Sequence, residues 1–595
     1  MWSRVPLLRC FAFYRPHWRI LLVATAVMAV ANLLMPFTFV ILGQALTDLK
    51  SGAGVDAAWH WSIALLALAF GRGLVQYLGT VLSIMAGQRL LHDLRLAIFT
   101  QVQRLDPAWH AIHGSGEIVS RTTRDSDQVR DAITGGWRTI VELVVMVVSV
   151  LATLWWYHPL LGVVPTVLTL IGMTLVVRQG WAIARLDAQA GDAYDGVLQD
   201  IDEGVRGVRV VKAFSLEASR ATRFSGHLAT YERFELATGW FIATRQPLPQ
   251  FIVALGHVWV FVAGAWLIAN GLTGVGTLVA ALLLVQMIIF RVEAVGNLQQ
   301  MLAKAHASAE RIIAVLDAQP ALATGHKALP GAPAKSAAGA AQPPLGLRLE
   351  HVRVALGGRN VLDGCDLTIR PGEIVALVGP TGSGKSTLAA LASRLRDPDA
   401  GRVLIGSDAT GWTDARQLDR DALRRAVQVV FQDAFLFSDT VAANLRRARP
   451  DADDAALDRA IAQAVAGDVL ATLPDGLASK VGERGVTLSG GQRQRLCLAR
   501  ALVARPAILV ADDATSALDA VTEQKILDGL RAAGDHPTLL LIAGKLSTIL
   551  LADRVALLDQ GRIVASGSHE ELLENSPAYR DLLGLDKSAA VGRVS

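Results

Sequence analysis

The chain has 595 residues, which is too long for one compact domain. Hydrophobic residues make up 52% of it and charged residues only 18%, a balance that excludes an ordinary soluble globular protein. The net charge of +4 is too small to indicate a nucleic-acid partner, and three cysteines far apart in sequence predict neither a metal site nor a disulfide framework.

The N-terminal segment is basic and then apolar. Residues Trp2 to Tyr14 predict an amphipathic helix that lies on the inner membrane face. A cleavable signal peptide is the alternative, but the apolar run from Ile20 to Leu46 is too long for a signal core.

Apolar segments long enough to cross a bilayer recur in the first half of the chain. They lie near 20–46, 58–86, 134–156, 160–179, 249–269 and 275–294. Two of them continue into long, charged, helix-patterned stretches, at 87–131 and 180–245, which are rich in arginine. The short connections hold almost no positive charge, so the positive-inside rule places the long stretches and both termini in the cytoplasm. We therefore expect a multi-pass protein of the inner (cytoplasmic) membrane whose membrane domain is an α-helical bundle over residues 1–317.

Polar residues within or near these segments are candidates for contact with a transported substrate. They are Asn32, Gln44, Gln76, Glu142, His257 and Gln286. Glu142 is the best candidate, although an interhelical hydrogen bond or a helix-end position would also explain it. Proline at 36, 247 and 249 predicts kinks in the helices that contain these residues.

The composition changes after the last apolar segment. Residues 318–346 are rich in Ala, Pro and Gly and predict a flexible, partly extended linker. From Leu347 onward, short β-rich runs alternate with helical ones, which is typical of an α/β domain. We expect this domain to span 347–585 and to be followed by a tail over 586–595.

A phosphate-binding loop lies near the start of the second domain. The apolar strand Val375–Val378 leads into G-x-x-x-x-G-K-S and then into an apolar helix, which is the context such a loop requires. Its residues are Gly379, Pro380, Thr381, Gly382, Ser383, Gly384, Lys385, Ser386 and Thr387. A second buried strand ends at Asp512, so ATP is the predicted ligand, with Mg²⁺ held by Ser386 and Asp512.

A further motif, Leu488-Ser-Gly-Gly-Gln492, precedes the strand that ends at Asp512. The phosphate loop, this motif and that strand follow one another in the order that resembles ATP-binding cassette (ABC) transporters of the exporter type. The resemblance covers nearly the whole chain. It implies an α/β P-loop cassette in the second domain and head-to-tail pairing of two cassettes. It also implies that Ser489, Gly490, Gly491 and Gln492 contact ATP bound by the opposite subunit.

The resemblance assigns further segments. Gln432 resembles the glutamine that contacts Mg²⁺ and the attacking water, and 481–485 resembles a segment that contacts the membrane helices. Ser516–Asp519 resembles the loop that crosses the dimer interface. Segments 116–125 and 203–217 resemble the two cytoplasmic coupling regions, and Ser308–Arg311 resembles the helix end that leads to the cassette.

Three positions depart from the family pattern. Asp513 stands where the family has the glutamate that acts as general base, and Gly544 stands where it has the switch histidine. Leu356 stands where it has the aromatic residue that stacks on adenine, so π-stacking is lost. The shorter carboxylate of Asp513 predicts slower hydrolysis, unless it remains a working base or Lys545 replaces the histidine.

These departures predict a heterodimer. This chain's own ATP site would bind but hydrolyse weakly, and an unlike half-transporter would supply the catalytic Glu and His. The resemblance implies that the pair exports a small molecule, lipid or peptide of hydrophobic or amphipathic character by alternating access. A siderophore-type importer on the same fold and an ATP-gated channel or regulator are the alternatives.

Overall fold

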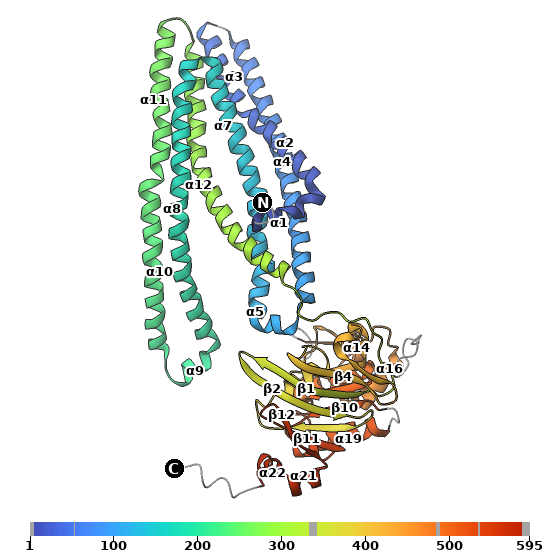
Figure 1. Cartoon of the computed structure of the whole chain (residues 1–595). Helices are drawn as coiled ribbons and strands as arrows, with labels where there is room; N and C mark the ends of the chain where they lie inside the picture. The colour runs from blue at the N-terminus through green and yellow to red at the C-terminus, as the bar shows by residue number, and fades with distance from the viewer. Residues whose placement is uncertain (1–4, 53, 332–341, 483–487, 533–535, 586–595) are drawn as a thin grey trace. The chain divides into compact units, whose positions relative to one another are not determined.

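The computed structural model describes residues 5–52, 54–331, 342–482, 488–532 and 536–585. It divides into two compact units. The first combines residues 1–105 and 113–319, and the second combines 106–112 and 320–595. Each unit is described by itself (Figure 1).

The first unit is built from helices (Figure 1). A short helical segment opens it: α1 (Pro6–Phe11), η2 (Ala12–His17), α2 (Trp18–Leu33) and α3 (Met35–Lys50). The following helices are α4 (Val55–Arg104), α5 (Pro107–Ser120), η3 (Arg121–Asp125), α6 (Ser126–Asp131), η4 (Ala132–Gly136), α7 (Trp137–Tyr157), α8 (Pro159–Arg206), α9 (Val208–Ala213), α10 (Glu217–Arg245), α11 (Pro247–Ala269) and α12 (Val275–Asp317). The first six residues of α5 fall in the other compact unit.

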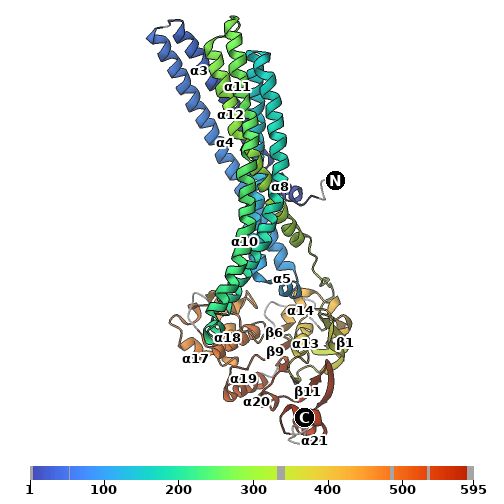
Figure 2. The same ribbon diagram turned by 90° about the vertical axis from the view of Figure 1, so that its left-hand side faces the viewer.

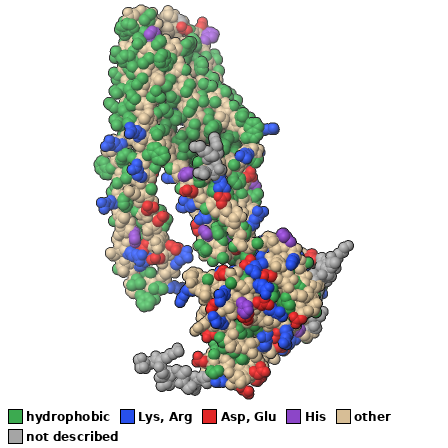
Figure 3. Space-filling view, viewed as in Figure 1, with side chains coloured by type: hydrophobic (Ala, Val, Ile, Leu, Met, Phe, Trp, Pro, Cys, Tyr) green, Lys and Arg blue, Asp and Glu red, His purple; other side chains and the backbone are tan. Residues whose placement is uncertain are grey.

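Six helical stretches in the described residues are long and apolar enough to cross a membrane. Each of the six predicted spans falls within one of them, so the predicted membrane bundle is confirmed. The expected kinks are present, because α2 gives way to α3 just before Pro36 and α10 gives way to α11 just before Pro247. Hydrophobic side chains cover the part of this unit that holds the spans, and Lys and Arg gather on the rest (Figure 3).

The N-terminal segment is helical over most of the range in which a helix was expected, Trp2 to Tyr14. The described helix begins at Pro6, and residues 1–4 lie outside the described residues. Cys10 of α1 and Tyr14 of η2 are both buried. Arg9 forms an ion pair with Asp317 at 2.6 Å, so this segment packs onto the end of α12.

Small residues and one buried carboxylate hold the long helices together. Gly276 of α12 lies so close to α3 that a Cβ there would overlap the carbonyl oxygen of Gly43, a close approach that only glycine permits. Asp125 is buried and accepts two hydrogen bonds from Arg311, at 2.6 and 2.9 Å. The helices α8 and α10 run side by side and are joined through α9 (Figure 2).

The second unit contains β-sheets covered by helices. Its strands are β1 (Gly346–Leu356), β2 (Arg359–Ile369), β3 (Ile374–Val378), β4 (Ala400–Ser407), β5 (Gly411–Asp414), β6 (Val427–Val430), β7 (Asp439–Thr440), β8 (Lys480–Val481), β9 (Ile508–Asp512), β10 (Thr538–Ile542), β11 (Arg554–Asp559) and β12 (Arg562–Gly567). Its helices are α13 (Lys385–Ala392), η5 (Ala415–Gln417), α14 (Arg420–Ala426), α15 (Val441–Arg446), α16 (Asp454–Gln463), α17 (Gly467–Ala471), η6 (Gly476–Ala478), α18 (Gly490–Val503), α19 (Ala520–Ala532), α20 (Leu546–Ile549), α21 (His569–Asn575) and α22 (Pro577–Leu582).

The main sheet has the order β12-β11-β3-β10-β9-β6, in which only β12 is antiparallel to its neighbour. The residues of β3, β9 and β10 are all buried, as expected of parallel strands covered on both faces. A second, antiparallel sheet has the order β2-β1-β4-β5. The predicted α/β cassette is therefore present.

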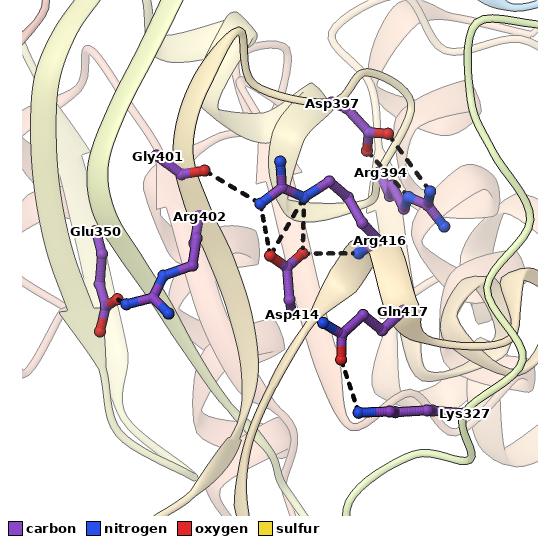
Figure 4. Close-up of polar contacts among 9 residues, drawn as sticks. All are labelled: Lys327, Glu350, Arg394, Asp397, Gly401, Arg402, Asp414, Arg416 and Gln417. Carbon is purple, nitrogen blue, oxygen red and sulfur yellow. Dashed lines mark hydrogen bonds and ion pairs between the residues drawn. The ribbon is translucent and has the colours of Figure 1, made fainter.

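The segment expected to be a flexible linker is in part attached to the second unit. The backbone of Lys327 pairs with Gln417 and Asp419, and its ammonium group donates to the Gln417 side chain at 2.8 Å (Figure 4). Nearby, Arg394 is buried, forms an ion pair with Asp397 and donates to the backbone oxygen of Ala323. These backbone hydrogen bonds fix residues 323–327 in a way that an Ala, Pro and Gly composition does not reveal. Residues 332–341 lie outside the described residues.

Candidate nucleotide-binding site

Four parallel strands end at the same edge of the main sheet, and each carries a predicted site residue just beyond its end. The strand β3 leads into the phosphate loop, β9 ends at Asp512, β10 ends two residues before Gly544, and β6 ends two residues before Gln432. In register, Ile542 pairs with Asp512 and with Leu377. The carboxyl edge of such a sheet is where open α/β folds bind ligands, so topology brings these residues together.

The phosphate loop takes a conformation that favours glycine. Gly382 and Gly384 have φ of +84° and +106°, in the left-handed region. A Cβ at Gly379 would overlap the carbonyl oxygen of Leu558. The loop ends where α13 begins at Lys385, so free backbone N–H groups and the positive end of the helix face the same space.

The polar side chains of the loop suit a phosphate. The ammonium group of Lys385 donates to the backbone oxygens of Gly379 and Pro380, at 2.8 and 2.9 Å. Burial lowers the pKa of Lys385, while the carboxylates of Asp512 and Asp513 act in the opposite direction. The Ser383 hydroxyl is buried without a hydrogen-bond partner in the described residues. Phosphate oxygens would satisfy both donors.

The candidate magnesium ligands also lie together. Ser386 donates a hydrogen bond to Asp512, and burial raises the pKa of the Asp512 carboxyl. Hydroxyl, carboxylate and amide oxygens are hard donors of the kind that Mg²⁺ prefers. Ser386, Asp512 and Gln432 all line one cavity of about 570 Å³. Its other lining residues are Val361, Gly379, Thr381, Gly382, Gly384, Lys385, Thr387, Asp513, Ile542, Ala543 and Gly544.

The adenine side of the site is less well defined. Leu356 ends β1, is 46% exposed and is not among the described residues that line the cavity. It faces Arg359 across the turn Gly357-Gly358, in which both glycines have positive φ. Leu356 therefore lies at a hairpin tip, and the second strand of that hairpin, β2, contributes Val361 to the cavity lining.

Asp513 and Gly544 stand at the two positions expected to activate the attacking water, and their surroundings differ. The Gln432 side chain donates to the Asp513 carboxylate at 3.0 Å. Burial raises the pKa of Asp513, while Lys545 and Gln432 counteract that effect. Asp513 has φ of +51°, a conformation that aspartate tolerates better than most residues. At Gly544, a Cβ would meet no atom within 4 Å, so the space that a histidine side chain would occupy there is open.

Lys545 is engaged away from the phosphate loop. Its ammonium group donates to the backbone oxygens of Thr515 and Leu518, at 3.2 and 2.9 Å. It therefore holds the segment expected to cross the dimer interface, which differs from the alternative that it replaces the switch histidine. Glu523, fully buried, accepts hydrogen bonds from Thr515, at 2.7 Å, and from Thr548. Neither contact with Glu523 was anticipated from sequence, because Thr515 lies in a turn and Thr548 lies in α20, whereas Glu523 lies in α19.

The signature segment begins a helix at a separate surface. Ser489 caps α18, and its hydroxyl and the Gln492 side chain form a capping box. Residues 489–492 line a cavity of about 380 Å³ that is distinct from the one above. In the same helix, the Gln494 amide bonds both to the Ser516 hydroxyl and to the Ala517 backbone N–H, each at 3.0 Å. The segment at 481–485 lies largely outside the described residues.

Glu142, the preferred intramembrane candidate, faces two arginines. Its carboxylate lies 3.5 Å from Arg291 of α12 and 3.6 Å from Arg138 of its own helix. This arrangement matches the interhelical alternative, because it links α7 to α12.

Comparisons with known proteins match both units. Residues 19–292 match the family described as "ABC transporter transmembrane region", and residues 362–516 match the family described as "ABC transporter". An ATP-dependent lipid A-core flippase of Thiobacillus denitrificans is 33% identical over 592 residues, covering 98% of each chain. A multidrug efflux ATP-binding/permease protein of Mycobacterium tuberculosis is 35% identical over 526 residues, and the match covers 88% of this chain but 42% of that protein. A solved structure of a bacterial Atm1-family ABC exporter with ATP bound has a TM-score of 0.79 and 26% identity, covering 96% of this chain and 99% of the other.

Proposed function

This chain belongs to the ABC transporter family and has the exporter fold, and we propose that it is one half of a heterodimeric, ATP-driven exporter. Its partner would be an unlike half-transporter. The substrate would be hydrophobic or amphipathic, as a small molecule, lipid or peptide, and it would leave across the inner membrane with both termini of this chain in the cytoplasm.

The observation that carries the proposal is the contrast within the cavity of about 570 Å³. The groups that would hold the triphosphate and Mg²⁺ are in place, namely the phosphate loop, Lys385, Ser386 and Asp512. The groups that would activate water are reduced to Asp513, one methylene shorter than glutamate, and to open space at Gly544. Such a site supports ATP binding more than ATP hydrolysis.

The proposed mechanism assigns tasks to the groups that line this cavity. Lys385 leaves the backbone oxygens of its own loop to bind the terminal phosphates, and the backbone N–H groups of residues 382–385 surround the others. Ser386, Gln432 and Asp512 would hold Mg²⁺, which neutralises phosphate charge when bound. Gln432 orients the Asp513 carboxylate and thereby a water molecule at this site.

The signature residues supply the argument for an unlike partner. Ser489 and the N-terminus of α18 lie at a surface separate from this chain's own cavity, which suits contact with a nucleotide held by another subunit. That signature segment retains the family pattern, whereas the hydrolytic positions of the same chain do not. An intact signature segment contributes to hydrolysis if the partner's own ATP site has both the Glu and the His and is completed by Ser489 to Gln492 of this chain.

The experiment reconstitutes this chain with the half-transporter encoded beside it, in vesicles with ATP added outside. We expect the two chains, carrying different tags, to co-purify, and fluorescent lipid or drug probes to accumulate in vesicles whose cassettes face outward. ATP-dependent loss of preloaded probe from these same vesicles would indicate an importer. ATP-dependent ion conductance without accumulation would indicate a channel, and either result would reject the exporter.

A further inference from the structure

A cavity of about 220 Å³ lies among α8, α10, α11 and α12 of the helical unit. Its lining residues are Val176, Gln179, Gly180, Ile183, Ile242, Gln246, Gln250, Val292, Gly296, Asn297 and Gln300. We call it the amide cavity, because five of these eleven side chains are carboxamides. The helices α8, α11 and α12, which carry most of the lining residues, pack against one another (Figure 1).

Most of these carboxamides are unused within the fold. Gln179 donates to the backbone oxygen of Arg245 at 3.0 Å. The side chains of Gln246, Gln250, Asn297 and Gln300 make no hydrogen bond in the described part of the chain. All but Asn297 are half-buried, so water reaches them only in part. Four carboxamides with no hydrogen-bond partner in the described chain therefore converge on one partly apolar cavity, and a few convergent polar groups in such a cavity are typical of a ligand-binding site.

The chemistry of the lining restricts that ligand. No charged side chain belongs to the lining among the described residues, so an anionic headgroup would enter without a counter-charge. Arg178 and Arg245 adjoin lining residues in sequence but do not themselves line the cavity, and Arg291 forms an ion pair with Glu142. Each carboxamide presents a donor and an acceptor side by side, which matches hydroxyl groups that also donate and accept.

The position of the cavity adds an apolar requirement. Gln179 ends one predicted span, Gln250 begins another, and Val292 lies at the end of a third, so the cavity is at a boundary between apolar and charged helix. Val176, Ile183, Ile242 and Val292 supply apolar wall beside the amides. An amphiphile could place its headgroup among the amides and its chain along the exposed apolar helix surface.

We propose that the amide cavity binds the uncharged, hydroxyl-rich headgroup of an amphiphilic substrate and discriminates against phosphate-bearing lipids. The proposal rests on the exporter function above, since it names the substrate class of that transporter. It concerns binding, which does not require ATP.

The test uses the assembled transporter in phosphatidylcholine nanodiscs without nucleotide. Two photoreactive lipids that carry the same diazirine at the start of the acyl chain, next to the headgroup, are compared: a glucosyl diacylglycerol and a phosphatidic acid. We expect the glucosyl lipid to label the protein about tenfold more than the phosphatidic acid, with adducts in residues 176–183 and 292–300. Equal labelling by the two lipids, or adducts only elsewhere in the protein, would overturn the proposal.

Variants make the assignment specific. The double substitution Gln250→Leu/Gln300→Leu removes two free amides, and we expect glucosyl-lipid labelling to fall about tenfold. Gln299→Leu is the matched control, because Gln299 is a half-buried glutamine of α12 that does not line the cavity and whose side chain donates to the backbone oxygen of Val177. Labelling that falls equally in both variants, or in neither, would contradict the proposal.

A second variant covers the case in which the double substitution does not fold. Gln300→Arg adds one cation to the cavity, and we expect the preference to shift toward phosphatidic acid by about tenfold; an unchanged preference would contradict the proposal. If the glucosyl lipid binds as expected but is not moved when ATP is added to proteoliposomes, the exporter function fails while the binding site stands. If the lipid is transported but labels other helices, the amide cavity is not its binding site, whereas the exporter function stands.

Discussion

Restoring the two altered hydrolytic positions should raise ATP turnover at this chain's own site. The perturbation is Asp513→Glu with Gly544→His. A side chain fits at 544, because a Cβ there meets no atom within 4 Å, and Gly544 lines the same cavity as Lys385 and Asp513. An imidazole would thus enter the space beside the phosphates without displacing another group.

The expected magnitude follows from two contributions. A preorganised donor to the reacting phosphate is worth roughly 10²–10³-fold in rate. Moving the carboxylate forward by about 1 Å is worth roughly 100-fold. Both act on the same water, so they do not multiply fully, and position 513 has φ of +51°, which glutamate tolerates less well than aspartate. We expect an increase of about 10²–10³-fold.

The assay is single-turnover hydrolysis of labelled ATP by the assembled pair, with the partner's phosphate-loop lysine substituted so that only this site can turn over. Gly544→Leu is the control, because it fills the same space without a donor. A double variant no faster than the parent chain would refute the geometric argument, as would an equal increase with leucine.

Three further predictions concern the same units. Lys545→Met should lower the ATPase activity of the pair about tenfold, because the segment at 515–518 loses its two contacts with the ammonium group. The affinity of this chain for nucleotide should change less than twofold, and Lys545→Arg should retain activity. A loss of nucleotide affinity as large as the loss of activity would argue against a positioning role for Lys545. Burial raises the pKa of Asp512, so its ionised form destabilises the fold above that pKa and not below the ordinary value of 3.8. Asp512→Asn should therefore raise the melting temperature without nucleotide at pH 7 but not at pH 3, and should abolish stabilisation by Mg-ATP; equal melting temperatures at pH 7 would contradict this. Asp125→Ala should destabilise the helical unit by about 1–3 kcal/mol, measured by thermal unfolding, because Arg311 and Ser308 lose the carboxylate that accepts hydrogen bonds from both. Asp131→Ala is the control, since it removes a more exposed carboxylate and should have little effect.

Periodicity and motif context predicted the architecture well. Six spans, the phosphate loop and the strand ending at Asp512 are encoded by contiguous residues, so local pattern suffices to locate them. The sheet topology then determines how the site assembles, because the parallel strands place Asp512, Gln432 and Gly544 at one edge of the sheet although they are far apart in sequence.

Contacts made at long range were not predictable in this way. The attachment of Lys327 to residues 417–419 depends on an edge of the second unit that composition does not reveal. The engagement of Lys545 with backbone oxygens depends on where a loop passes, and the pairing of Asp125 with Arg311 joins residues 186 apart. The amide cavity likewise collects glutamines and an asparagine from separate helices, none of which was singled out from sequence.

The most direct test of the central claim, that this chain binds ATP but depends on an unlike partner to hydrolyse it, compares steady-state ATPase activity of the purified chain alone with that of the assembled pair. ATP binding to both preparations is checked in parallel. We predict that the chain alone binds ATP but turns it over at about 1% of the rate of the pair or less. Equal rates per cassette in the two preparations would contradict the account.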